Sequence, residues 1–179
     1  YLVDTGNYKA VLNYIPQAEK LMLQWKELLT AVEELTFYQL FLELLLPIER
    51  YEDTLHYLNK ITERDKEQQR LDLAAKARVI RLIIFYEQND KINLDNLVQS
   101  TYKYLYQKGQ LYQLEKVVLK FFRKLSDSKD KQEKQALFND FKQEVAQYRN
   151  DHKQFMLFES IDLELWEERK LSGTKNREL

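Results

Sequence analysis

The stretch TAVEELTFYQLFLELLLPIERYEDTLHYLNKIT, residues 30–62, decides the fold class of this chain. Thr30 and Glu33 have the spacing of a capping box, in which each side chain pairs with the other residue's backbone N–H at the start of a helix. Apolar residues then recur every three or four positions until Pro47 ends the run, and a second run follows after a short connection. This pattern predicts two amphipathic helices that form an antiparallel hairpin. The inward positions of the two runs are Leu35, Tyr38, Phe41, Leu42 and Leu45, then Tyr51, Thr54, Leu55, Leu58 and Ile61.

The same helical periodicity extends from Tyr8 to Trp166, with a new helix about every 20 residues. Pro16 interrupts the first run, so we expect a break or kink there, with Pro16 opening the second piece. Gly109 has the position of the left-handed residue that ends a helix. The remaining boundary signals are Asp65 and Asn93 as expected N-caps and Asn89-Asp90 as an expected turn.

Composition supports an all-helical protein. Of 179 residues, 44% are hydrophobic and 32% are charged, which supplies both a core and a solvated surface. Three glycines and two prolines are too few for the turns of an all-β fold, so we predict seven to nine helices. The chain has no cysteine, which excludes disulfides and thiolate metal sites. The apolar stretch 40–48 is too short to span a membrane.

The sequence predicts one main domain. We expect a flexible lead-in over residues 1–7, a single helical-repeat domain over residues 8–170 and a disordered tail over residues 171–179. The chain begins with Tyr1 instead of Met, which we interpret as the start of a fragment of a longer protein. We expect a cytoplasmic location, although a removed targeting segment stays open.

Pairs of helices that repeat at about 34 residues are typical of the tetratricopeptide repeat. Residues 34–62 fit that repeat, with Tyr38 early in the first helix and Tyr51 opening the second, and a second copy fits residues 98–121. The stretch 74–166 also resembles the C-terminal region of a group of uncharacterised bacterial tetratricopeptide-like proteins. The residues behind this resemblance are Ala77-Arg78-Val79-Ile80, Leu82, Tyr86-Glu87, the run 100–105, the run 111–116, the run 158–162 and Trp166.

The resemblance implies a fold and no activity. The fold is an α-solenoid, in which antiparallel hairpins stack into a right-handed superhelix, and a closed helical bundle is the alternative.

Motifs for catalysis or cofactor binding are missing from the sequence. No phosphate-binding glycine loop, nucleophile elbow or zinc-protease motif occurs. Asp53 and His56 could share a helix face as metal ligands, but a surface ion pair is the simpler interpretation, and His152 is interpreted as a solvated residue. We therefore predict no enzyme activity, no cofactor and no metal. Three glutamates in apolar surroundings are expected to form ion pairs between helices with Arg78, Arg81 or Lys103; they are Glu43, Glu87 and Glu115.

Charge and tyrosine content point to one segment as a candidate binding surface. Residues 1–60 have five basic and nine acidic side chains, whereas residues 101–135 have nine basic and four acidic side chains with several of the 12 tyrosines between them. Bases with aromatic residues are typical of single-stranded nucleic-acid grooves. However, Tyr102 and Tyr106 share a stripe with Val98, so we expect at least two of the aromatic side chains in the core.

We therefore predict a non-enzymatic scaffold that binds a protein or peptide partner in a groove lined by tyrosine and lysine. A nucleic-acid-binding helical repeat is the alternative, and nucleic acid is the less favoured partner. Oligomerisation through exposed terminal helices stays open. The predicted partner-binding residues are Tyr102, Tyr106, Tyr112, Lys116 and Lys120.

Overall fold

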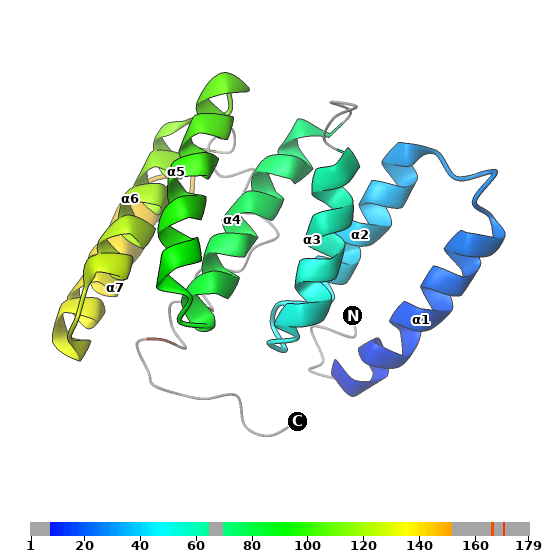
Figure 1. Ribbon diagram of the computed structural model, residues 1–179, viewed down its shortest axis with the longest axis horizontal. Coiled ribbons are helices and arrows are strands. Elements are labelled where there is room, and N and C mark those ends of the chain that lie inside the picture. Colours follow the sequence, from blue (N-terminus) through cyan, green and yellow to red (C-terminus); the bar gives the residue numbers. More distant parts are fainter. Residues whose placement is uncertain (1–7, 65–69, 152–165, 167–169, 171–179) are drawn as a thin grey trace. The chain divides into compact units, whose positions relative to one another are not determined.

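The computed structural model describes residues 8–64, 70–151, 166 and 170. Over these residues the protein is all helical, as the sequence predicts, with seven helices and no strand (Figure 1). The helices are α1 (Tyr8–Gln24), α2 (Ala31–Leu45), α3 (Tyr51–Arg64), α4 (Leu71–Glu87), α5 (Lys91–Gln107), α6 (Gln113–Asp127) and α7 (Lys131–Ala146). Contacts divide them into two compact units, one containing α1 to α3 and the other containing α4 from Ala74 onward with α5 to α7.

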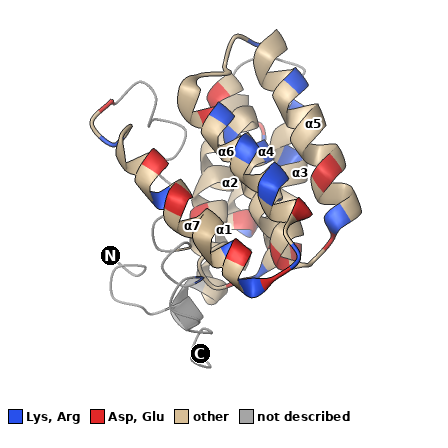
Figure 2. Cartoon of the chain, turned by 90° about the vertical axis from the view of Figure 1, so that its left-hand side faces the viewer, with Lys and Arg blue, Asp and Glu red and all other residues tan. Residues whose placement is uncertain are grey.

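Charged residues of both signs occur along the helices. In Figure 2 the basic and acidic positions are interspersed and are not gathered by sign. The segment 101–135 illustrates this, because Glu115 and Asp127 lie on the same helix as four of its bases. Asp127 places one negative side chain on α6 beside its bases, whereas Glu115 is buried.

The α2–α3 hairpin forms the core of the first unit. All five inward positions predicted on α2 are buried, and the Phe41 ring packs on the Tyr57 ring of α3 with centroids 4.9 Å apart. The predicted capping box is present, since the Thr30 backbone N–H donates to the Glu33 carboxylate at 2.8 Å and the Glu33 N–H donates to the Thr30 hydroxyl at 3.2 Å. Helix α1 contacts α2.

In the second unit α6 packs between α5 and α7. The Phe121 ring of α6 stacks on the Phe141 ring of α7, with centroids 4.0 Å apart and planes 8° apart. Helix α4 joins this unit partly through Arg78, whose guanidinium lies 3.8 Å from the centre of the Tyr104 ring of α5. Gly109 has φ +67°, which confirms the predicted left-handed turn between α5 and α6.

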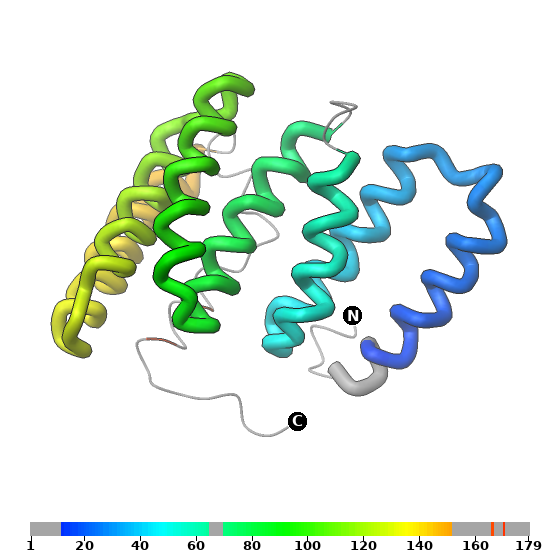
Figure 3. The backbone as a smooth tube through the Cα atoms, in the orientation of Figure 1, coloured from blue at the N-terminus to red at the C-terminus, as the bar shows by residue number. Residues whose placement is uncertain are grey.

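Two predictions about helix boundaries are wrong. Helix α1 continues through Pro16 without a break, and Figure 3 shows it as one uninterrupted coil. Proline removes one backbone donor, and Pro16 lies on the exposed side of the helix, where the loss of one bond is tolerated. Helix α5 is capped by Asp90, not Asn93, because the Asp90 carboxylate accepts the Asn93 backbone N–H. The sequence instead predicts that Asp90 belongs to the turn before the helix.

Several predictions fall outside the described residues. These are the lead-in over residues 1–7, the Asp65 cap, His152 and the tail over residues 171–179. The single domain over residues 8–170 and the superhelix stay predictions. Among the helices described, none is both long enough and apolar enough to cross a membrane.

Candidate functional site

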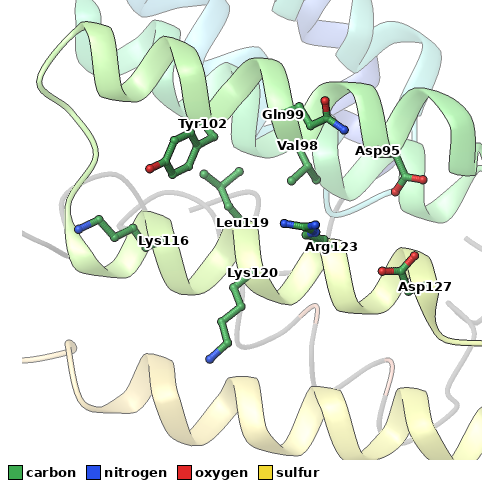
Figure 4. A pocket seen from close by; sticks show the side chains of 9 residues that line it. All are labelled: Asp95, Val98, Gln99, Tyr102, Lys116, Leu119, Lys120, Arg123 and Asp127. Atoms are coloured by element: carbon green, nitrogen blue, oxygen red, sulfur yellow. The ribbon is translucent and has the colours of Figure 1, made fainter.

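A groove of about 650 Å³ lies between α5 and α6 in the second unit (Figure 4). Its side chains recur at helical intervals on both walls, so each helix presents one face to the groove. The lining residues are Asp95, Val98, Gln99 and Tyr102 from α5, and Lys116, Leu119, Lys120, Arg123 and Asp127 from α6.

The floor of the groove is apolar and its sides are charged. Val98 and Leu119 are buried at the floor, whereas Lys116, Lys120 and Arg123 are exposed on α6. None of the residues described by the structure forms an ion pair with these three bases. In Figure 4 the Arg123 guanidinium lies between α5 and α6 and Lys116 lies at one end of the groove, whereas the Lys120 side chain points away from α5. Lys116 and Arg123 are therefore the cationic groups best placed for a ligand on the apolar floor.

The two ends of the groove differ in charge. Tyr102 and Lys116 lie at one end, and Asp95 and Asp127 lie at the other (Figure 4). The buried Ser126 hydroxyl of α6 donates a hydrogen bond to the Asp95 carboxylate of α5. This bond links the two walls and holds one carboxylate at the acidic end.

The structure brings together three of the five predicted site residues, namely Tyr102, Lys116 and Lys120, as lining residues of this groove. Tyr106 does not line it, but its ring lies parallel to that of Tyr102, with planes 3° apart and centroids 6.4 Å apart. Tyr112 is half-buried at the N-cap of α6 and does not line the groove.

The prediction that tyrosines of the α5 stripe lie in the core is wrong for Tyr102 and Tyr106. They are 50% and 70% exposed. The buried stripe of α5 drifts by alternating steps of three and four, through Leu94, Val98, Thr101 and Leu105. One residue along a helix is a turn of about 100°, so the tyrosines that follow Thr101 and Leu105 point away from the core.

Sequence reasoning missed the acidic end of the groove. Asp95 lies seven residues before Tyr102, and Asp127 lies seven residues after Lys120. These are spacings of two helical turns, which place each aspartate on the same face as the predicted site residue. This periodicity is the signal that could have found them. Arg123, which is not among the five predicted site residues, also lines the groove.

The glutamates predicted to form ion pairs between helices have other surroundings within their own units. Glu43 accepts a hydrogen bond from Gln39 at 2.8 Å. Glu87 accepts from the Trp166 indole N–H at 2.6 Å and pairs with Lys170. Glu115 is buried, and neither of its carboxylate oxygens has a hydrogen-bond partner.

The Glu115 carboxyl is strongly altered by its surroundings. Burial raises the pKa of its carboxyl to about 7, and the backbone amides of Glu115 and Tyr112 at the start of α6 partly oppose that rise. Because Glu115 does not line the groove, it supplies no acid or base there. Its carboxyl can nevertheless gain or lose a proton near neutral pH.

Asp53 and His56, the candidate metal ligands, make other contacts. Asp53 pairs with Arg50 at 2.5 Å, and the exposed His56 ring packs edge-on against Tyr57. Within the described residues, no three histidine or acidic side chains are arranged to hold a metal ion.

A second cavity, of about 330 Å³, lies in the first unit among α1, α2 and α3. Four of its five charged groups pair with one another, since Lys60 lies 3.6 Å from Glu19 and Arg64 lies 2.8 Å from Glu34, and Lys26 is the fifth. A charged ligand would have to displace these partners, which makes this cavity the weaker candidate.

Comparisons with known proteins give no further guide, because no protein-family model, curated protein or solved structure matches this chain.

Proposed function

We propose that this chain is a non-enzymatic, tetratricopeptide-like scaffold that binds a protein or peptide partner in the groove between α5 and α6. The observation that supports it most is the combination of the apolar floor at Val98 and Leu119 with bases on one wall that form no ion pair with a described residue. Apolar area supplies affinity, and unpaired charge supplies orientation and a faster association rate. The helix hairpins α2–α3 and α5–α6 are the kind of unit that such a scaffold repeats.

The aromatic side chains beside the groove support the same proposal. Tyr102 and Tyr106 leave a stacked pair of rings half or more exposed, which is contact area that folding has not used. Tyrosine is enriched in binding hot spots because its rigid ring buries a large area and its hydroxyl can still hydrogen-bond.

The test is a selection of random 16-residue peptides on the intact chain, followed by affinity measurements with the groove variant Lys116→Glu/Lys120→Glu. The control variant Lys103→Glu/Lys131→Glu reverses two exposed lysines that do not line the groove. Peptides that lose affinity for the groove variant alone support the proposal. Peptides that bind all three proteins equally would show that the groove is not the binding surface.

Nucleic acid is the second candidate, favoured by the unpaired bases and stacked tyrosines and disfavoured by Asp95 and Asp127 at one end of the same groove. Binding of single-stranded oligonucleotides would weaken steeply as salt is raised, because phosphate contacts release counterions. Oligonucleotide binding that is absent, or insensitive to salt, would eliminate this candidate.

A further inference from the structure

We infer that the partner segment is an amphipathic helix of about three turns, with acidic side chains toward the Tyr102–Lys116 end of the groove and a basic side chain toward the Asp95–Asp127 end. This inference rests on the proposed function and adds the conformation, length and charge order of the ligand.

The length follows from the spacing of the wall residues. Lys116 and Asp127 are eleven residues apart on α6, which is about 16 Å at the rise of an α-helix. A ligand helix needs about 11 residues to cover this distance. An extended peptide would need only about five.

The conformation follows from hydrogen-bonding needs. The groove walls are helices, whose backbone groups are bonded within each helix, and the floor is formed by apolar side chains. An extended peptide would place its own backbone N–H and C=O groups against this floor without partners, and burying such groups is costly. A helical ligand satisfies its backbone internally and offers an apolar stripe to Val98 and Leu119.

The charge order follows from the polarity of the groove. Lys116, Lys120 and Arg123 are spaced by four and three residues, so they follow one face of α6 over about two turns. Acidic side chains two turns apart on a ligand helix can meet Lys116 and Arg123, whereas Lys120 points away from α5 and adds positive charge at the edge of the groove. Asp95 and Asp127 disfavour an acidic group at the opposite end and favour a basic one.

The experiment starts from peptides selected on the intact chain. We expect groove-dependent peptides that lack internal proline, place apolar residues at helical spacing and separate acidic from basic residues by two to three turns. In a charge swap, changing the acidic residues of the best peptide to lysine lowers its affinity for the wild-type chain about tenfold. The groove variant Lys116→Glu/Lys120→Glu restores binding of the swapped peptide, and the control variant Lys103→Glu/Lys131→Glu does not.

The outcomes separate this inference from the proposed function. If groove-dependent peptides are extended and rich in proline, or if the swapped peptide is not rescued, the inference is wrong and the binding function stands. If no selected peptide depends on the groove, both fail. The substituted lysines are exposed, so we expect each variant to keep its helices. Circular dichroism of each variant checks this.

Discussion

The ring of Tyr102 lies parallel to the ring of Tyr106 one helical turn later on α5, with ring planes 3° apart and centroids 6.4 Å apart. Both rings are exposed, and only Tyr102 reaches the groove between α5 and α6. Tyr106 therefore supports the position of the Tyr102 ring from outside the groove. The two tyrosines should contribute unequally to binding and little to folding.

We expect Tyr102→Ala to weaken the affinity of a groove-dependent peptide about tenfold, or about 1.4 kcal/mol, because an aromatic contact is lost. Tyr106→Ala should weaken it by about threefold, through loss of the stacking partner alone. Isothermal titration calorimetry measures both. Urea unfolding serves as the control, since exposed substitutions should change stability by less than about 0.5 kcal/mol. Equal losses for the two variants would contradict this account of the pair.

Glu115 should make the stability of the chain depend on pH. Its carboxyl has a folded pKa of about 7, above the unfolded value, so the folded state holds a proton that the unfolded state releases. Stability is then highest at low pH within this window and falls as pH rises from about 4.5 to about 7.

The neutral variant Glu115→Gln should remove this pH dependence. We expect it to match the wild type near pH 5 and to exceed it by about 2 kcal/mol near pH 8, where the buried carboxylate would be charged. Urea unfolding at both pH values measures the difference. Wild-type and variant stabilities that change in parallel with pH would show that the Glu115 carboxyl is not the titrating group.

Trp166, which lies far along the chain from α4 and α6, packs into the aromatic core of the second unit. The centre of its ring lies 5.8 Å from the ring centre of Phe122 and 5.3 Å from that of Phe138. Its indole N–H donates a hydrogen bond to the Glu87 carboxylate. Trp166→Ala should lower the free energy of unfolding by about 3 kcal/mol through the lost packing. Trp166→Phe keeps a smaller aromatic ring, so it should lower the free energy of unfolding by less than Trp166→Ala does, through the lost hydrogen bond and part of the packing.

The other tryptophan provides the control for this prediction. Trp25 is 55% exposed, so Trp25→Ala should change stability by less than about 0.5 kcal/mol. Similar losses for the two alanine variants would mean that the Trp166 contacts do not stabilise the core.

The capping box of α2 should contribute measurably to stability. Thr30→Ala removes the hydroxyl that accepts the Glu33 backbone N–H, and loss of such a cap costs about 1 kcal/mol. Thr36→Ala is the matched control, because Thr36 is an exposed residue inside the same helix. Thermal unfolding of both variants tests the prediction, and a Thr36 variant as unstable as the Thr30 variant would refute the specific role of the cap.

The core residues could be predicted from the spacing of apolar residues in the sequence, because backbone geometry sets which side chains of a helix share its buried face. Leu35, Phe41 and Leu45 on α2 are buried as predicted. Local boundary chemistry was less predictable. Pro16 ends no helix, because the loss of one hydrogen bond is tolerated on an exposed helix face.

The groove was predictable only in part. Helical spacing indicates which residues share a face with Lys116, Lys120 and Tyr102, but whether the face of α5 meets the face of α6 depends on the register between the two helices. Asp95 and Ser126 are separated by 31 residues and meet only when α5 packs on α6. No periodicity within one helix contains that register.

The central claim is that a partner helix binds between α5 and α6, and nuclear magnetic resonance tests it most directly. A selected peptide is titrated into the isotope-labelled chain, and the backbone amide shifts are mapped onto the structure. The account predicts that the largest shifts fall on residues 95–102 and 116–127, on the two walls of the groove. Largest shifts in the first unit, around the cavity among α1, α2 and α3, would contradict it.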